Sequence, residues 1–225
     1  MNNIVACVLT VGGGTYTEEY VNALAQACRR NLTVEYKFIC LTDSVNTFSN
    51  AVDVVIPLNH GFPKWWGKME LFNQPLFAEN KVLFLDLDTV IVDNIDFVFS
   101  YTPLRLTALE DFYFEENLGS GIMYYIGGRY DFIYTNFMKS PMSVIRNTPT
   151  GDQTWIKDNL ERYDRLQHIF PKKFVSFKSH CAKNRNYKVG DPIAIPEGAS
   201  VICFHGYPKP HDINHPMISN NWFST

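Results

Sequence analysis

Two aspartates one residue apart, Asp86 and Asp88, follow an apolar run that begins at Lys81. An acid-x-acid pair at the end of a strand can present oxygens from both side chains to one hard divalent cation. Aspartate also favours turns, so a plain turn is the alternative interpretation. Residues 89–92 read Thr-Val-Ile-Val and resume as strand, which argues against a mere turn. The spacing therefore predicts a cation site.

A histidine and a lysine near the end of the chain could act with this pair. The stretch VICFHGYPKPHD, residues 201–212, places His205 after another apolar run and Lys209 four residues later. A neutral imidazole can complete a carboxylate site, and such mixed ligands suit Mn²⁺ better than Ca²⁺, with Mg²⁺ as the alternative. A lysine on a proline-stiffened loop can reach a diphosphate on the same ion. We therefore expect Asp86, Asp88 and His205 as metal ligands.

The elements that must position these residues alternate between strand and helix in the first half of the chain. A helix is expected after Thr17, which can cap it, and its acidic first turn and basic last turn suit the helix dipole. The expected strands cover residues 3–11, 36–41, 51–57, 81–87, 104–109 and 119–126, and further helices begin at Pro63 and cover 129–139 and 152–162.

The strands of the first half are continuously apolar, which is typical of a parallel sheet covered on both faces. We therefore predict an α/β fold with a mixed, mostly parallel central sheet flanked by helices, in one domain of residues 1–225. Ligands of such sheets bind at the carboxyl ends of the strands. Asp43, Asp86 and Asp88 each come just after a strand, so we expect them along one edge of the sheet.

Composition argues against two classes of function. The chain carries 20 Lys and Arg against 23 Asp and Glu, without the basic stripe of a nucleic-acid-binding protein. No apolar run approaches the roughly 18 residues that a membrane span needs. The 5 cysteines are an odd number and three lie in apolar segments, which indicates buried thiols in a reducing compartment. We expect a cytoplasmic protein, in a bacterial cell or, if viral, in the host cytoplasm.

Two classes of enzyme use an acid pair of this kind. In haloacid-dehalogenase-type phosphatases the first Asp attacks phosphorus and the second acts as acid and base. The stretch VLFLDLDTVI fits that motif locally, but the motif usually ends the first strand, and here about eighty residues precede it. In nucleotide-sugar glycosyltransferases, a cation held by two carboxylates neutralises the charge that develops on the leaving nucleoside diphosphate. The preceding strand–helix–strand unit would then form the nucleotide pocket.

The motif FLDLDTVI and the tail motif together resemble the GT-A glycosyltransferases of the family 8 kind, such as glycogenin and the bacterial lipopolysaccharide galactosyltransferases. Those enzymes close with His-Phe-x-Gly-x-x-Lys-Pro-Trp, and this chain has a shortened His-Gly-x-Pro-Lys-Pro-His. The stretches LTVGGGTYTEEY, LTD, LGSGIMYY and GDQTWI follow in family order, so the resemblance covers residues 3–210. Gly119 stands at the family's Asn position, and no donor contact is carried over there.

The resemblance also implies residues that bind the donor. Thr10 and Val11 would supply backbone contacts, Tyr16 could stack on uracil, and Lys68 stands where a basic residue of the family contacts the donor. The whole set implied for donor binding is Thr10, Val11, Tyr16, Asp43, Lys68, Asp86, Leu87, Gln153, Gly206 and Lys209. Residues 1–100 would form the nucleotide-binding half, and residues 101–225 the acceptor side with the metal and diphosphate loop.

Asp152, in GDQTWI, corresponds to the Asp that opens a helix beside the anomeric carbon, and it is the expected catalytic carboxylate. It would deprotonate the acceptor in an inverting reaction or stabilise an oxocarbenium-like sugar in a retaining one. The alternative is a structural N-cap. The activity implied is transfer of a hexose from a nucleotide diphosphate sugar, expected to be UDP-linked, to a hydroxyl of a glycan acceptor.

The tail and the aromatic residues leave further alternatives. Cys203, His205, His211 and His215 could instead be zinc ligands, although no Cys-x-x-Cys pair supports them. Flat side chains near the strand ends could stack on sugar rings, with core packing as the alternative; these are Trp65, Trp66, Tyr113, Phe114 and Trp155. Trp222 and Phe223 could fold over a bound donor as a lid.

Overall fold

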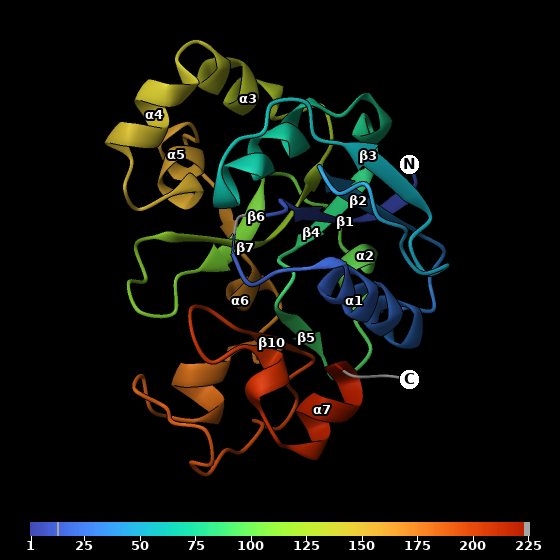
Figure 1. Ribbon diagram of the computed structural model, residues 1–225, viewed down its shortest axis with the longest axis vertical. Helices are drawn as coiled ribbons and strands as arrows, with labels where there is room; N and C mark the ends of the chain where they lie inside the picture. Colours follow the sequence, from blue (N-terminus) through green and yellow to red (C-terminus); the bar gives the residue numbers. More distant parts are fainter. Residues whose placement is uncertain (13, 223–225) are drawn as a thin grey trace.

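The centre of the molecule is a seven-stranded sheet with the strand order β3-β2-β1-β4-β7-β6-β8 (Figure 1). The computed structural model describes residues 1–12 and 14–222, so the predicted lid residue Phe223 lies outside the described residues. The strands are β1 (Asn3–Leu9), β2 (Lys37–Thr42), β3 (Val54–Pro57), β4 (Lys81–Leu85), β6 (Thr107–Glu110), β7 (Leu118–Ile126) and β8 (Asp164–Arg165). Helices flank this sheet, and the predicted α/β class is confirmed.

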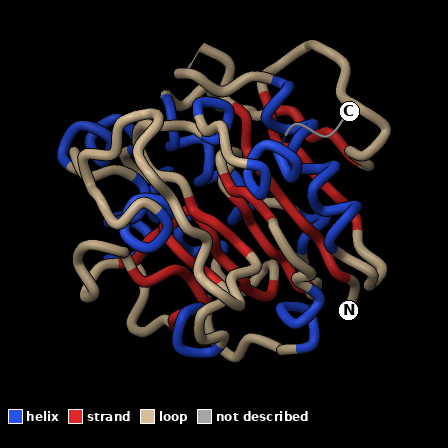
Figure 2. Tube along the Cα trace, turned by 90° about the horizontal axis from the view of Figure 1, so that it is seen from below, coloured by secondary structure: helices blue, strands red, loops and turns tan. Residues whose placement is uncertain are grey.

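The sheet is mixed and mostly parallel, as predicted. β3, β2, β1 and β4 are parallel neighbours, β6 is parallel to β8, and β7 runs antiparallel to β4 and β6. Figure 2 shows the strands side by side, with helices and loops around them. Because β7 is reversed, its first residues lie beside the last residues of β4, with Ile122 opposite Leu85. The next amide, of Asp86, donates to the carbonyl of Gly121 at 2.8 Å. One edge of the sheet therefore gathers the ends of β1 and β4 and the start of β7.

The first helix, α1 (Glu18–Asn31), follows the prediction. Thr17 stands at its N-cap without a side-chain capping hydrogen bond, and the acidic first turn and basic last turn are as expected. The segment after Pro63 is the 3-10 helix η1 (Lys64–Asn73). The other helices are η2 (Pro75–Phe77), α2 (Asp96–Ser100), α3 (Asp131–Met138), α4 (Pro141–Asn147), α5 (Asp152–Asp158), α6 (Leu166–Ile169), η3 (Phe177–Cys181), η4 (Pro210–Asp212) and α7 (Pro216–Trp222). Within the described chain, every helix is too short or too polar to cross a bilayer.

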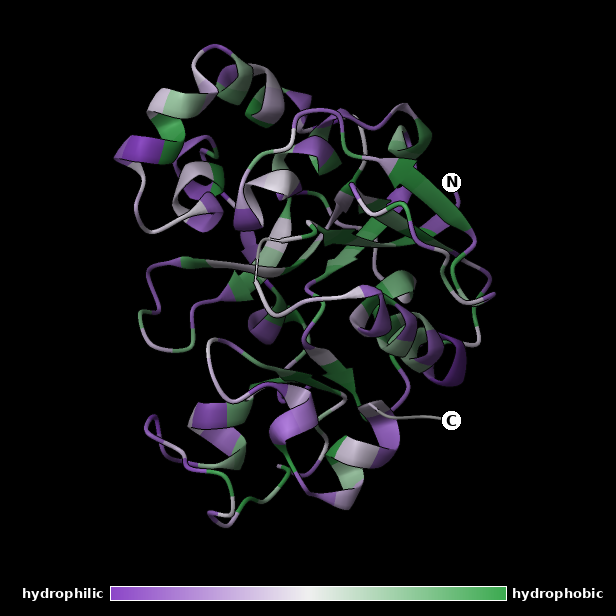
Figure 3. Cartoon of the chain, viewed as in Figure 1, coloured by the Kyte–Doolittle hydropathy of each residue, from purple (hydrophilic) through white to green (hydrophobic). Residues whose placement is uncertain are grey.

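Both faces of the central sheet are buried, which explains its continuously apolar strands. In β1, Val5 and Leu9 point into a core that includes α1 and the C-terminal segment. Ile4 and Ala6 point into the opposite core, which includes η1 and α3. The central strands are accordingly drawn mostly in green, the hydrophobic colour, in Figure 3. Burial of both faces stabilises the sheet, because each residue of β1 from Ile4 to Leu9 contributes to one core or the other.

A second, three-stranded sheet brings the tail to the acid pair. Its order is β5 (Thr89–Ile91), β10 (Val201–Cys203) and β9 (Phe174–Ser176), with β5 and β10 antiparallel. Cys203 is paired with Thr89, the residue directly after Asp88. His205 follows Cys203 by two residues, so this pairing carries His205 to the acid pair from more than a hundred residues away.

Several boundaries differ from the predictions: the strand expected at 3–11 ends at Leu9, and the one expected at 51–57 begins at Val54. The strand expected at 81–87 ends at Leu85, and Asp86 to Thr89 form a turn closed by a 3.1 Å hydrogen bond between the Thr89 amide and the Asp86 carbonyl. A turn at the acid pair and a strand after it are thus both present. The turn is needed because β4 belongs to the central sheet, whereas β5 belongs to the second sheet. The helix expected at 152–162 ends at Asp158, and the strand expected at 104–109 begins at Thr107.

Candidate functional site

A cavity of about 550 Å³ opens at the edge where β1 and β4 end and β7 begins. It is lined from both halves of the chain, by the segments after β1, β4 and β10, by the start of β7 and by the start of α5. Eleven residues predicted as donor, metal or catalytic groups line it: Thr10, Tyr16, Lys68, Asp86, Leu87, Asp88, Asp152, Gln153, His205, Gly206 and Lys209. The sequence motifs therefore converge on one concave site, as the topology of the sheet requires.

Two predicted donor contacts, Val11 and Asp43, do not line this cavity. They bind each other instead: the Val11 amide donates to Asp43 Oδ1 at 2.7 Å. Asp43 follows β2, the neighbour of β1, so its carboxylate holds the loop that leaves β1. The loop in turn carries Thr15 and Tyr16 to the cavity.

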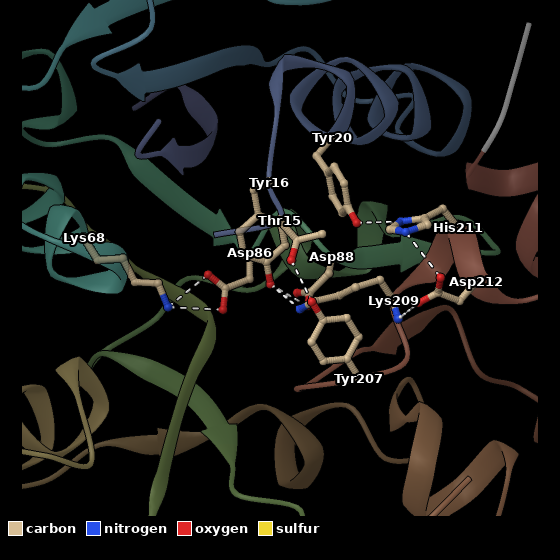
Figure 4. Close-up of polar contacts among 10 residues, drawn as sticks. All are labelled: Thr15, Tyr16, Tyr20, Lys68, Asp86, Asp88, Tyr207, Lys209, His211 and Asp212. Atoms are coloured by element: carbon tan, nitrogen blue, oxygen red, sulfur yellow. Dashed lines mark hydrogen bonds and ion pairs between the residues drawn. The ribbon is translucent and has the colours of Figure 1, made fainter. Parts of the chain in front are cut away.

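Asp86 and Asp152 are joined by a single lysine. Lys68 Nζ lies 2.9 Å from Asp86 Oδ1 and 3.3 Å from Asp152 Oδ2, and it is 3.5 Å from Ser120 Oγ. Gly121 leaves room for Asp86, because a Cβ at that position would lie 3.3 Å from Asp86 Oδ2. In Figure 4, Lys68 reaches Asp86 from the side opposite to the C-terminal loop.

The crowding of charges around Lys68 shifts the pKa of its partners. Burial raises the pKa of Asp86, Lys68 opposes that rise, and the charges of Asp88 and Asp152 add to it, for a pKa of about 7. Burial alone would lower the pKa of Lys68, but the carboxylates of Asp152 and Asp86 raise it above the ordinary value. The lysine therefore stays charged at neutral pH and stabilises two acids that would otherwise repel each other.

Asp88 is bound by the C-terminal loop and by the loop after β1. Its Oδ2 accepts a 2.7 Å hydrogen bond from Lys209 Nζ and a 2.8 Å hydrogen bond from the Tyr16 hydroxyl (Figure 4). Lys209 Nζ also donates to the Tyr16 oxygen at 2.6 Å, which closes a three-membered network. Burial, followed by the charge of Asp88, raises the pKa of Tyr16 well above its usual range, so the phenol keeps its proton.

His205 lies in the same cavity but bonds elsewhere. Its Nε2 is 2.7 Å from the hydroxyl of Ser176, at the end of β9. Its ring stacks on Phe112 and meets Tyr113 edge-on, at centroid distances of 5.9 and 5.1 Å. Burial, and next the charge of Lys178, lower the pKa of His205 below its ordinary value. The imidazole is therefore neutral at physiological pH, which is the form that binds metals.

The predicted metal ligands have the right chemistry for Mn²⁺ or Mg²⁺. Asp86, Asp88 and His205 supply oxygen and neutral imidazole donors, and all three line the cavity. As the side chains stand, though, no three His, Cys, Asp or Glu residues of the described chain are grouped closely enough to hold an ion. Asp86 is held by Lys68, Asp88 by Lys209 and His205 by Ser176. The three side chains thus supply the kinds of donor atom that such an ion prefers, and each of them is bonded to another residue.

The alternative zinc site in the tail is not assembled among the described residues. His211 Nδ1 lies 2.6 Å from the Tyr20 hydroxyl, and His215 Nδ1 accepts from the amide of Met217 at 3.3 Å. Only Cys203 and His205 of the four proposed ligands line the cavity. The histidines at 211 and 215 hold α7 and the η4 segment in place.

Asp152 does not cap the helix that it opens. The N-cap of α5 is Gly151, at a φ of 91°, and no side chain makes a capping hydrogen bond there. Asp152 is instead 5% exposed, faces the cavity and pairs with Lys68, and its Oδ2 has no hydrogen-bond partner within the described residues. Gly151 is needed at this point because a Cβ would lie 2.6 Å from Nε1 of Trp65. The alternative interpretation of Asp152 as an N-cap is thus wrong.

The predicted aromatic platform is divided between site and core. Trp65 and Tyr113 line the cavity, whereas Trp66 stacks on Phe137 in the core at 5.4 Å. Trp155 also packs against Phe137, and Phe114 is exposed away from the cavity lining. Trp222 is no lid: it is 4% exposed and packs edge-on against Tyr20 of α1.

Several residues that line the cavity, or that contact its lining as Ser176 does, were not predicted from the sequence. Ser120 contacts Lys68, Ser176 contacts His205, and the Tyr207 hydroxyl is 3.0 Å from Thr15 Oγ1 across the mouth of the cavity. Ser120 follows Gly119 in the stretch LGSG, where small residues beside a predicted strand end could have drawn attention to it. Ser176 and Tyr207 carry no such signal, because only the pairing of β9 with β10 and the path of the loop bring them to the site.

Solved structures resemble this chain in three dimensions, whereas no protein-family model and no curated protein matches its sequence. The glycosyltransferase GlyE of Streptococcus pneumoniae TIGR4 aligns with a TM-score of 0.68 and 15% identity over 93% of this chain, which spans 56% of the GlyE chain. The galactosyltransferase LgtC, solved with donor and acceptor sugar analogues, gives 0.62 and 13% over 92% of this chain and 88% of its own. The bifunctional glycosyltransferase WbbM gives 0.66 and 12% over 100% of this chain and 50% of its own.

Proposed function

We propose that this chain, which has the GT-A fold that these glycosyltransferases share, is itself a glycosyltransferase. It would move a hexose from a nucleotide diphosphate sugar, UDP-linked, to a hydroxyl of a saccharide. The observation that carries this proposal is the convergence of eleven predicted site residues on one cavity at the strand ends. LgtC, which was solved with donor and acceptor sugar analogues, supports the same class of substrates.

We propose Mn²⁺, with Mg²⁺ as the alternative, as the cation of this site, held by Asp86, Asp88 and His205. When bound, such an ion supplies positive charge to the leaving diphosphate. The chain adds positive charge of its own through Lys209 and Lys68, both of which line the cavity. Three carboxylates and two ammonium groups leave this cluster with one net negative charge, so a divalent cation favours the entry of an anionic donor.

Asp152 is the proposed catalytic carboxylate. In the transfer, the bond between the anomeric carbon and the diphosphate oxygen breaks and a bond to the acceptor oxygen forms. In an inverting reaction Asp152 accepts the acceptor's proton, and in a retaining one it stabilises the positive charge at the sugar ring. Trp65 and Tyr113, which line the same cavity, offer flat surfaces to the acceptor's sugar rings.

Thermal shift with a panel of nucleotide sugars, each with and without Mn²⁺, tests the proposal. A UDP-sugar with Mn²⁺ should raise the melting temperature, since ligands that bind only the folded state stabilise it. Asp88→Ala and His205→Ala should each lower Mn²⁺-dependent donor hydrolysis by about 100-fold or more. Asp93→Ala is the matched control, because Asp93 is an exposed acid outside the cavity whose removal should leave the rate unchanged.

Two results would replace this function with another. Hydrolysis of p-nitrophenyl phosphate that disappears in Asp86→Asn would identify the phosphatase alternative. Tight binding of a nucleotide sugar without hydrolysis or transfer to any saccharide would identify a binding protein.

A further inference from the structure

The contact between Lys209 and Asp88 places a positive charge where the proposed cation must bind. Lys209 Nζ lies 2.7 Å from Asp88 Oδ2, and the side chains of the two residues are 9% and 4% exposed. The second carboxylate oxygen of Asp88 could bind a divalent ion, but that ion would lie within a few ångströms of the Lys209 ammonium group. Two cations that close together in a buried site repel each other strongly.

The backbone of Lys209 is held in place, whereas its charge stands at the end of a flexible four-carbon side chain. Proline precedes and follows it, and its amide donates to Asp212 Oδ2 at 2.8 Å. The ammonium group can therefore change partner without a shift of the backbone. Because Lys209 follows His205 by only four residues, a short loop delivers the ammonium group to the level of the acid pair.

We propose that Lys209 acts as an internal cation that occupies Asp88 in the ligand-free protein and moves to the diphosphate when the donor binds. This proposal rests on the proposed function, since the diphosphate is what draws Lys209 away. The metal then binds to Asp88 after its release, so donor and metal bind cooperatively.

The exchange follows from the cost of a buried unpaired charge. Lys209 cannot leave Asp88 for an apolar surface, because separating a buried ion pair is strongly unfavourable unless each partner finds a new one. A diphosphate supplies the new partner of Lys209, and the cation supplies the new partner of Asp88. Before the donor binds, Asp88 is free in only a small fraction of the molecules, and the apparent affinity for the cation is reduced in proportion to that fraction. The coupling is reciprocal, so the cation strengthens donor binding by the same factor.

The test measures Mn²⁺ affinity by the spectroscopic signal of free Mn²⁺, with and without UDP, so that it does not depend on catalysis. Lys209→Met should bind Mn²⁺ without UDP about tenfold more tightly than the wild type, because Asp88 then has only the neutral Tyr16 hydroxyl as a partner and no cation beside it. UDP should strengthen Mn²⁺ binding in both proteins, since a diphosphate also coordinates the ion. The factor by which UDP strengthens Mn²⁺ binding should be about tenfold smaller in Lys209→Met than in the wild type, because the variant has no Lys209–Asp88 ion pair to replace.

Three control variants separate the exchange from a general loss of charge. Lys178→Met removes a nearby lysine whose charge acts on His205 but which makes no bond to Asp88 within the described residues, so its gain in Mn²⁺ affinity should be clearly smaller than that of Lys209→Met. Lys209→Arg keeps the charge and should also keep the weak wild-type binding. Lys209→Gln replaces the ammonium group with a neutral amide donor and should show the same gain as Lys209→Met. It tests the proposal even if Lys209→Met does not fold.

Equal Mn²⁺ affinity in the wild type, Lys209→Met and Lys209→Gln without UDP would overturn the exchange, and so would an equal gain in Lys178→Met. If UDP binds under those conditions, the proposed function survives. If no variant binds UDP with or without Mn²⁺, both the function and the exchange are wrong.

Discussion

The shared lysine of Asp86 and Asp152 makes the proposed catalytic carboxylate depend on its neighbour. Lys68 reaches both acids, and on Asp152 it lies 3.3 Å from Oδ2, an oxygen buried in the described part of the chain. Asp152 also lines the cavity in which the donor sugar is proposed to bind. A carboxylate that a neighbouring cation already holds in place is suited to act on a reacting group, because its orientation costs little free energy at the moment of reaction.

Replacing Asp152 with Asn keeps the shape of the side chain and removes its charge. Sugar transfer should fall by about 100-fold or more, because a proposed base or electrostatic stabiliser is lost. Asp158→Asn is the matched control, since Asp158 ends the same helix and is exposed. Initial rates of transfer to a saccharide acceptor measure the effect. A near-normal rate in Asp152→Asn would remove this residue from the mechanism.

At the scale of elements, a carboxylate joins the end of α1 to the start of α2. Asp96, in the first turn of α2, accepts a 2.8 Å hydrogen bond from the Thr33 amide and further bonds from the Thr33 hydroxyl and Asn94. Burial alone would raise the pKa of Asp96, but these hydrogen bonds, with one from the Val34 amide, lower it from 3.8 to about 2. Ionisation of Asp96 is thus more favourable in the folded state than in the unfolded state, and it stabilises the fold.

Asp96→Asn should therefore destabilise the protein in a pH-dependent way. The folded-state pKa is depressed, so its contribution is complete above pH 3.8 and is lost as the pH falls towards 2. The urea midpoints of the wild type and the variant should differ by a constant amount between about pH 5 and 7, because Asp96 is ionised in both the folded and the unfolded state over that range. The difference should narrow below about pH 4. A gap that stays the same, or widens, at low pH would contradict this role of Asp96.

At the scale of the whole molecule, the C-terminal segment closes the site by packing on α1. Trp222 of α7 meets Tyr20 edge-on at 5.1 Å, and the Tyr20 hydroxyl contacts His211 in η4. η4 directly follows Lys209, so the same packing supports the loop that reaches Asp88. The tail therefore serves as a structural support for the cavity and not as a lid over it.

Trp222→Ala should lower the free energy of unfolding by roughly 3–5 kcal/mol, because a buried indole leaves a large void. Met142→Ala, at a side chain that is 62% exposed on α4, should change it by less than about 0.5 kcal/mol. Urea denaturation followed by circular dichroism measures both. A loss below about 1 kcal/mol in Trp222→Ala would show that the tail packs loosely on α1.

The sequence by itself determined the α/β class, the mostly parallel sheet and most members of the site. These follow from local properties: continuously apolar strands indicate burial on both faces, and acids directly after strands must lie at the carboxyl edge. Asp86, Asp88 and Asp152 were all identified in this way or by their motifs, and each lines the cavity.

Only the tertiary structure decided how these residues are paired. The hydrogen bond of Lys209 to Asp88 spans 121 residues of the sequence, and that of His205 to Ser176 spans 29. The hydrophobic periodicity of the sequence does not predict such contacts. The same holds for Lys68, which binds two acids from β4 and α5. Partners of this kind are selected by the register of two separate sheets and the packing between them, which depends on the whole chain and not on any one segment.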